Sequence, residues 1–333
     1  MTKTNNMEEK NMSKWVSYRP EIKIMDCTIR DGGLMNNHLF TDEVVKAVYT
    51  ACVEAGIDYM EIGYINSRRF FMPDKHGAWK YCSEDDLRRI VGDNDTPLKL
   101  SAMADAEKSD YHKDILPSSE SVLDMIRVAT YIHQIPLALD MIKDAHDKGY
   151  ETTLNLMAVS TIIEKELNEA LELLANSEVG TVYIVDSNGA LYSEQVHYLV
   201  EKYMDYMKPS GKRVGMHAHN NQQLAFANTI EAIIKGANIL DASMAGLGRG
   251  AGNCPMELLV GFLHNPRFRL RPILQCIQEH IEPLQGELMW GFDIPYMMTG
   301  LLNQHPRAGM SFNASSDRGD IVKFFDSITD SSS

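Results

Sequence analysis

The sequence has few cysteines and no pattern that pairs them. The five cysteines are scattered, their number is odd and no CxxC occurs: they are Cys27, Cys52, Cys82, Cys254 and Cys276. This excludes a disulfide framework and predicts reduced thiols in a cytoplasmic protein. No segment approaches the ~18 consecutive apolar residues of a membrane helix. The opening MTKTNNMEEKNMSKW has no apolar stretch of the kind found in secretory signals, so neither a membrane nor export is expected.

Positive charge is also scarce. The chain has 32 Lys and Arg against 46 Asp and Glu, a net charge of −14 and a pI of about 5.2. Such a surface repels phosphate backbones, so no nucleic-acid partner is expected. An anionic small molecule stays compatible, because a local cluster such as Arg30 with a metal can override the mean field. Hydrophobic residues make up 44%, which excludes disorder over most of the length.

Short apolar segments alternate with longer amphipathic ones from residue 21 to about 264. The apolar segments do not alternate cleanly with polar residues, as is typical of parallel strands buried on both faces. Eight β/α units in ~245 residues predict an α/β fold, a (β/α)8 TIM barrel. An open doubly wound sheet is the rival, but no G-x-G-x-x-G follows the first strand. The predicted strands span residues 22–29, 59–64, 98–104, 125–130, 152–159, 182–185, 213–218 and 239–245.

The helix between the first two strands has the clearest boundaries. Thr41 is its expected N-cap and Gly56 its expected stop. The helix after the third strand is weak. We divide the chain into a flexible N-terminal arm (1–20), a catalytic barrel (21–268) and a short helical C-terminal extension (269–333) with a loose tail over about its last twenty residues.

The clearest chemical signal is M-H-A-H-N at residues 216–220. Residues i and i+2 of a strand point the same way, so His217 and His219 can chelate one ion. The alternative to metal binding is that both histidines only form hydrogen bonds at the end of the strand. Asp31 follows the first strand. In a closed barrel the first strand lies beside the eighth, so only that one strand separates it from the seventh. Two histidines and a carboxylate would leave open positions for substrate, which predicts a divalent-metal site at the carboxyl end of the barrel.

Residues near these ligands have more than one interpretation. Arg30 is either an ion-pair partner or a stabiliser of the enolate of a 2-oxo acid. The glycine-rich G-L-G-R-G-A-G-N at 246–253 could cradle a phosphate, although it lacks the ending of a P-loop. Asn253 is either a further metal ligand or the N-cap of the last barrel helix. Cys254 is expected to pack and not to act as a nucleophile.

Three motifs together resemble a known superfamily. D-C-T-I-R-D-G-G at 26–33, H-A-H-N-N at 217–221 and the glycine-rich 246–253 are similar to the metal-dependent, pyruvate-handling TIM-barrel lyases and synthases. That superfamily includes 4-hydroxy-2-oxovalerate aldolase, hydroxymethylglutaryl-CoA lyase and the isopropylmalate and homocitrate synthases. R-D-G-G-L-M-N-N at 30–37 and N-L-M-A-V-S at 155–160 make the chain most similar to the 4-hydroxy-2-oxovalerate aldolase-like branch. I-G-Y at 62–64 and D-S-N-G at 186–189 add to this likeness.

The resemblance implies a set of roles and two departures. It implies Mn²⁺, Mg²⁺ or Zn²⁺ on Asp31, His217 and His219, assisted by Asn253, with Arg30 stabilising the enolate. The aldolases have a catalytic histidine where this chain has Leu34, and the synthases have a glutamate where it has Gly33. The acid–base residue is therefore open. The candidates are His38, Tyr64, Tyr296 and His305, of which the last two could equally be packing or interface residues.

The expected function is a divalent-metal-dependent aldolase or lyase that cleaves or forms a C–C bond of a 4-hydroxy-2-oxo acid through a pyruvate enolate. One alternative is a Claisen-type synthase joining an acyl-CoA to a 2-oxo acid. The other is a catalytically altered barrel that serves as a partner subunit, which the loss of the base at Leu34 motivates. The expected partners are a small 2-oxo acid and further copies of the chain in a homo-oligomer. The resemblance also implies an aldehyde dehydrogenase as a possible protein partner.

Overall fold

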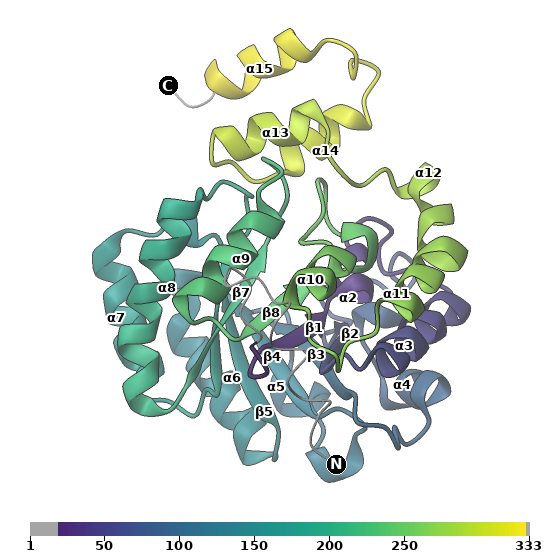
Figure 1. The fold of residues 1–333 in the computed structure, drawn as a ribbon, viewed down its shortest axis with the longest axis vertical. Coiled ribbons are helices and arrows are strands. Elements are labelled where there is room, and N and C mark those ends of the chain that lie inside the picture. Colours follow the sequence, from purple (N-terminus) through teal and green to yellow (C-terminus); the bar gives the residue numbers. More distant parts are fainter. Residues whose placement is uncertain (1–18, 331–333) are drawn as a thin grey trace, which may run out of the picture.

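The computed structural model describes residues 19–330, and the predicted arm at residues 1–20 lies almost entirely outside them. Eight parallel strands close into a barrel in sequence order, which confirms the predicted (β/α)8 fold (Figure 1). The strands are β1 (Lys23–Asp26), β2 (Tyr59–Tyr64), β3 (Lys99–Asp105), β4 (Met125–Thr130), β5 (Glu151–Leu156), β6 (Thr181–Asp186), β7 (Arg213–Ala218) and β8 (Ile239–Ala242).

Three strands are shorter than predicted, and at the first of them a polar side chain takes over a backbone hydrogen bond. The strand predicted at 22–29 ends at Asp26, and the chain turns into the short helix α2 (Thr28–Gly32). The Thr28 hydroxyl donates to Asp26 at 2.5 Å and accepts from the Met244 backbone N–H at 2.9 Å. These local bonds replace the ladder between β1 and β8. The strands predicted to end at 159 and 245 end at Leu156 and Ala242.

Helices cover the outside of the barrel, and an apolar core fills the space between them and the strands. The predicted caps of α3 are confirmed: Thr41 accepts from the Val44 backbone N–H, and Gly56 has φ +73°. The helix after β3 is a single turn. The barrel helices after α2 are α3 (Asp42–Ala55), α4 (Glu84–Val91), α5 (Tyr111–Asp114), α6 (Ile135–Asp147), α7 (Glu164–Ala175), α8 (Ser193–Met207), α9 (Ala225–Lys235) and α10 (Met256–Leu263).

The C-terminal extension consists of short helices, the last of which lie at one end of the barrel (Figure 1). The segment predicted as a loose tail includes the helix α15, where Phe324 is buried and stacks on Phe312 with ring centroids 4.5 Å apart. The division at residues 20 and 268 stays a prediction. The helices are α11 (Leu270–Cys276), α12 (Gln285–Leu288), α13 (Ile294–Leu301), α14 (Arg307–Asn313) and α15 (Ile321–Asp330).

Charged side chains occupy the middle of the barrel interior. Arg127 on β4 donates across the barrel to Asp241 on β8 at 2.6 Å and to Glu61 on β2 at 3.2 Å. All three residues are buried. Its guanidinium also lies 4.3 Å from the ring centroid of Tyr183. Barrel interiors are more commonly filled by branched apolar residues, so this buried charged layer is unusual. No helix among residues 19–330 is long and apolar enough to cross a membrane.

Candidate active site

The three predicted metal ligands converge at the carboxyl end of the strands. Asp31 lies on α2 directly after β1, His217 lies on β7 and His219 follows it. One ligand atom from each of the three lies within 4.8 Å of the others, and all three side chains are buried. Separations of this size fit a single divalent cation with two imidazole ligands and one carboxylate.

Hydrogen bonding around the histidines supports this fit. The Nδ1 of His217 lies 2.9 Å from a carboxylate oxygen of Asp241. Burial alone would raise the pKa of Asp241, but Arg127 and His217 lower it below its usual range, so the ionised carboxylate accepts from Nδ1 and leaves Nε2 free for a metal. The Nδ1 of His219 and the Oδ1 of Asn253 are buried without a partner among the described residues. Such atoms are rare, and a cation would satisfy them.

Asn253 borders the cluster and is not a helix cap. Its Nδ2 donates to Asp31 at 2.9 Å, while the N-cap position of α10 is Pro255, so the capping alternative is excluded. Nitrogen and oxygen of an amide are placed by their hydrogen bonds, and a half-turn of this group would present Oδ1 to the cluster. A side chain at residue 248 would lie 2.4 Å from Asn253 and 2.6 Å from Asp31, so only glycine lets the loop approach them.

Arg30 forms ion pairs with two carboxylates. Its guanidinium donates to Asp31 at 2.5 Å and to Glu61 at 2.6 Å, and all three groups are buried. Burial alone would raise the pKa of Asp31, but Arg30 with His219 and His217 holds it well below its usual range. Asp31 is therefore ionised at neutral pH, as a metal ligand must be. Glu61 joins Arg30 to Arg127, and Arg127 leads through Asp241 to His217, so one buried charge network supports both sides of the cluster.

His38 lies in the space that its neighbour Gly33 leaves open. A Cβ at Gly33 would lie 2.0 Å from the Nδ1 of His38, and the His38 N–H donates to the Gly33 carbonyl at 2.7 Å. His38 is buried, and its Nδ1 has no hydrogen-bond partner among the described residues. Leu34 packs instead against an apolar group at the top of the barrel that includes Tyr64 and Met103. The chain thus packs a buried histidine against Gly33, the second residue after Asp31, although it has none at position 34.

Tyr64 and Lys80 form the wall beside His38. Tyr64 ends β2, is buried, and packs edge-on to the His38 ring with centroids 5.1 Å apart. Lys80 lies on the loop between β2 and α4, and its Nζ is 4.0 Å from the Tyr64 ring centroid. Burial, followed by the charges of Lys80 and Arg30, lowers the pKa of His38 well below its usual value, so the imidazole is neutral at pH 7.

Arg249 reaches over the cluster from the loop after β8. Its backbone N–H donates to Asp31 at 3.3 Å, and its guanidinium donates to the Ser187 carbonyl at 2.9 Å. The guanidinium also lies 3.1 Å from the Nε2 of His305, and its own Nε has no partner among residues 19–330. Burial, with the nearby charge of Arg249, lowers the pKa of His305 to about 4, so His305 is neutral and adds no positive charge beside Arg249.

Tyr296 is not brought to the cluster by a described contact. It lies on α13, where its ring packs against Gly250 and Gly309, and its carbonyl accepts from Asn221. Burial raises the pKa of its hydroxyl, and a hydrogen bond with Asn313 opposes that shift. The hydroxyl therefore faces α14, and a catalytic role for Tyr296 stays a prediction.

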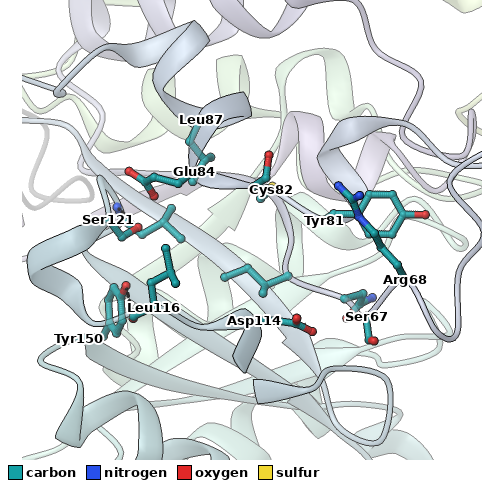
Figure 2. Close-up of a pocket in the computed structure, with 14 residues that line it drawn as sticks. Ser67, Arg68, Tyr81, Cys82, Glu84, Leu87, Asp114, Leu116, Ser121 and Tyr150 are labelled. Atoms are coloured by element: carbon teal, nitrogen blue, oxygen red, sulfur yellow. Dashed lines mark hydrogen bonds between the residues drawn. The ribbon is translucent and has the colours of Figure 1, made fainter. Parts of the chain in front are cut away.

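A separate cavity of about 350 Å³ lies outside the barrel, between the β2–α4 loop and the segments that precede β4 and β5 (Figure 2). Arg68, Tyr81, Glu84 and Asp114 line it among others, and none of the predicted site residues does. The short α5 leaves this part of the barrel surface thinly covered. The cavity is therefore a consequence of the weak third helix and not part of the metal cluster.

Comparison with known proteins identifies the family. A family model described as HMGL-like matches residues 21–279. The chain belongs to the HMGL-like family. Its HMGL-like relatives include 4-hydroxy-2-oxovalerate aldolase 3 of Rhodococcus jostii (strain RHA1), 31% identical over 72% of this chain and 70% of that protein. The oxaloacetate decarboxylase of Mycobacterium tuberculosis (strain ATCC 25618 / H37Rv) is 31% identical over 72% of this chain and 69% of that protein.

A solved HMGL-like structure supports the fold. The HMG-CoA lyase from Brucella melitensis has a TM-score of 0.65 at 16% identity, covering 80% of this chain and 99% of that one. At such identity the likeness bears on the fold alone. The family membership and the named relatives confirm the predicted enzyme class: the chain is a lyase that acts on carbon–carbon bonds.

Four residues around the HMGL-like site were not predicted. Arg127 and Asp241 carried a signal, since each is a lone charge within a strand predicted to be buried on both faces, where a charge must find a partner. Arg249 lies within the glycine-rich motif 246–253 and Lys80 carried no signal; neither was singled out, because the sequence does not reveal the paths of their loops.

Proposed function

We propose that the chain is a metal-dependent aldolase that cleaves 4-hydroxy-2-oxo acids to pyruvate and an aldehyde. One observation carries the proposal: Asp31, His217 and His219 place ligand atoms within 4.8 Å beside an arginine and an unpartnered histidine. When bound there, with help from Asn253, a divalent cation such as Mn²⁺, Mg²⁺ or Zn²⁺ supplies a Lewis acid that polarises the 2-oxo group.

The protein groups then divide the remaining work. The unpartnered Nε of Arg249 offers one charge-assisted donor to the substrate carboxylate. Neutral His38 takes the proton of the 4-hydroxyl group as its oxygen becomes the aldehyde carbonyl. The C3–C4 bond breaks, its electron pair forms the pyruvate enolate, and Arg30 stabilises the enolate oxygen. The protonated His38 returns its proton to C3, directly or through water, which completes pyruvate and restores the neutral base.

Decarboxylation of oxaloacetate is a second candidate, supported by the likeness to the mycobacterial enzyme. There the bond from C3 to the carboxylate breaks, CO₂ leaves and the same enolate forms, but no hydroxyl proton has to be removed. The two reactions therefore differ in their need for a base. They share Arg30 and the metal ligands.

Pyruvate release distinguishes the candidates. Purified protein with Mn²⁺ is assayed on a 4-hydroxy-2-oxo acid and on oxaloacetate, beside His38→Ala and the exposed-site control His146→Gln. Loss of a general base lowers kcat of aldol cleavage by about 10²-fold or more, whereas decarboxylation should change little. If neither substrate releases pyruvate but acetyl-CoA with a 2-oxo acid releases thiol, the synthase alternative replaces the proposal. If none of these reactions occurs, the altered-barrel alternative takes its place.

A further inference from the structure

Lys80 is a buried cation without an anionic partner. Its residue exposure is 5%, and its Nζ lies 4.0 Å from the ring centroid of Tyr64 and 4.1 Å from that of Phe71. Among residues 19–330, no carboxylate forms an ion pair with it and no acceptor takes one of its N–H groups. Aromatic faces stabilise the charge of an ammonium, but they leave its three donors without oxygen acceptors.

The position of Lys80 connects it to the reaction site. It belongs to the loop after β2, on the side of a barrel where loops bind substrate. That loop packs on the loop that carries His38, since the Gly77 N–H donates to the Asn37 carbonyl at 2.9 Å. Tyr64 touches both Lys80 and His38. The carboxylate that acts on the charge of Lys80 is that of Asp105. Asp105 accepts a hydrogen bond from Asn66 at 2.8 Å and forms no ion pair with Lys80.

We propose that Lys80 binds a second anionic group of the substrate, a carboxylate or a phosphate, at the end remote from the 2-oxo acid. This rests on the proposed aldolase function and names its substrate class: doubly anionic 4-hydroxy-2-oxo acids. Arg249 and Arg30 already bind the 2-oxo acid end of the substrate. Lys80 is therefore available for a negative charge on the other side of the C3–C4 bond that breaks. A buried charge is costly when alone, and a bound anion offsets that cost.

The charge state of Lys80 fits this role and makes it sensitive to pH. Burial lowers the pKa of the ammonium to about 8; Asp105 opposes that shift, while Lys108 and Arg30 add to it. The neighbouring His38 is neutral at pH 7 and adds no charge. Lys80 is thus positive below pH 8 and loses its charge above it. The preference for a second anion should therefore fall as the pH rises through about 8.

The test compares three 4-hydroxy-2-oxo acids of equal length, ending in a carboxylate, a phosphate ester or a methyl group. We expect kcat/KM of the wild type to favour at least one charged ending by about tenfold or more, and the favoured ending identifies the anion. Lys80→Met should abolish this preference; because loss of the Lys80 charge also acts on His38 and can change turnover of all three substrates alike, the readout is the ratio of kcat/KM between the endings within each variant. Lys80→Arg, which keeps the charge, should retain the preference, and so should the exposed control Lys75→Met. A wild type without preference, or equal losses on all three substrates, would overturn the inference and leave the aldolase function intact.

Binding gives a readout that does not require turnover. Calorimetry with Mn²⁺-loaded protein compares a 2-oxo dicarboxylate with a 2-oxo monocarboxylate of the same length, neither bearing a 4-hydroxyl. Tighter binding of the dicarboxylate, lost in Lys80→Met and restored in Lys80→Arg, supports the site even if no aldol is cleaved. Equal affinity of the two acids sinks it.

Discussion

The strands and the loops above them build the two halves of this site in different ways. The strand half consists of Glu61, Arg127, His217 and Asp241, all buried and joined in one network of ion pairs. The loop half consists of groups such as His38 and Arg249, which keep buried unpartnered nitrogen atoms, and Lys80, whose ammonium lies against an aromatic ring without an ion-pair partner among the described residues. Ion pairs fix the geometry of the strand network, although Glu61 Oε1 and Asp241 Oδ1 in it remain unpartnered, whereas the unmet nitrogen atoms of the loops are available to a substrate. The comparison indicates that the strand half fixes the geometry of the metal site, whereas the loop half supplies the base and the groups that meet the substrate.

The largest effect should come from the metal ligands. Asp31→Asn removes the charge that opposes the cation, so we expect loss of bound metal and a fall in pyruvate release of about 10³-fold or more. Metal content after dialysis is measured beside the surface control Asp42→Asn. If the Asp31 variant kept one metal ion per chain, this carboxylate would not be needed for metal binding.

Arg127 tests whether the strand network stabilises the fold. Arg127→Met leaves Glu61 and Asp241 without their shared cation, and breaking a buried pair lowers the free energy of unfolding by about 3–5 kcal/mol. The matched control is Arg89→Met, whose partner Asp42 is exposed and whose loss should stay below about 1 kcal/mol. Urea denaturation at pH 7 measures both. Equal effects would remove the distinction between the network and a surface pair.

Gly33 tests the placement of His38 in the loop half. In Gly33→Ala the new methyl group collides with the His38 ring, and displacing a base in this way costs about tenfold to hundredfold in kcat. Metal content should not change. In a His38→Ala background the same substitution should have no further effect, because the two act through one group. Additive losses in the double variant would mean that Gly33 matters for another reason.

Tyr296 should give the smallest effect. Since its hydroxyl faces α14, Tyr296→Phe should change kcat and KM by less than about twofold, against the 10²-fold or more expected of a general acid. Steady-state kinetics on the same substrate decides this. A large fall in kcat would place the C-terminal extension in the catalytic half of the comparison.

How far the sequence predicts the site depends on the element that carries each residue. His217 and His219 could be predicted because the two-residue period of a strand fixes which side chains share a face. The strand ends were less certain, since Thr28 diverts the backbone bonds of β1 to a side chain. The helix α15 was missed because tertiary contacts, such as the stacking of Phe324 on Phe312, stabilise it more than local propensity does.

By itself the sequence determined the parallel barrel, the end of the barrel at which polar residues gather, and the pairing of Asp31 with the two histidines. These follow from periodicity and from strand order, which are local or topological properties. Only the tertiary structure decided that His38 fills the space over Gly33, that Arg249 covers Asp31 and that Lys80 lies without a counter-ion. Each of these depends on how separate loops pack on one another, and no repeat in the sequence encodes that packing.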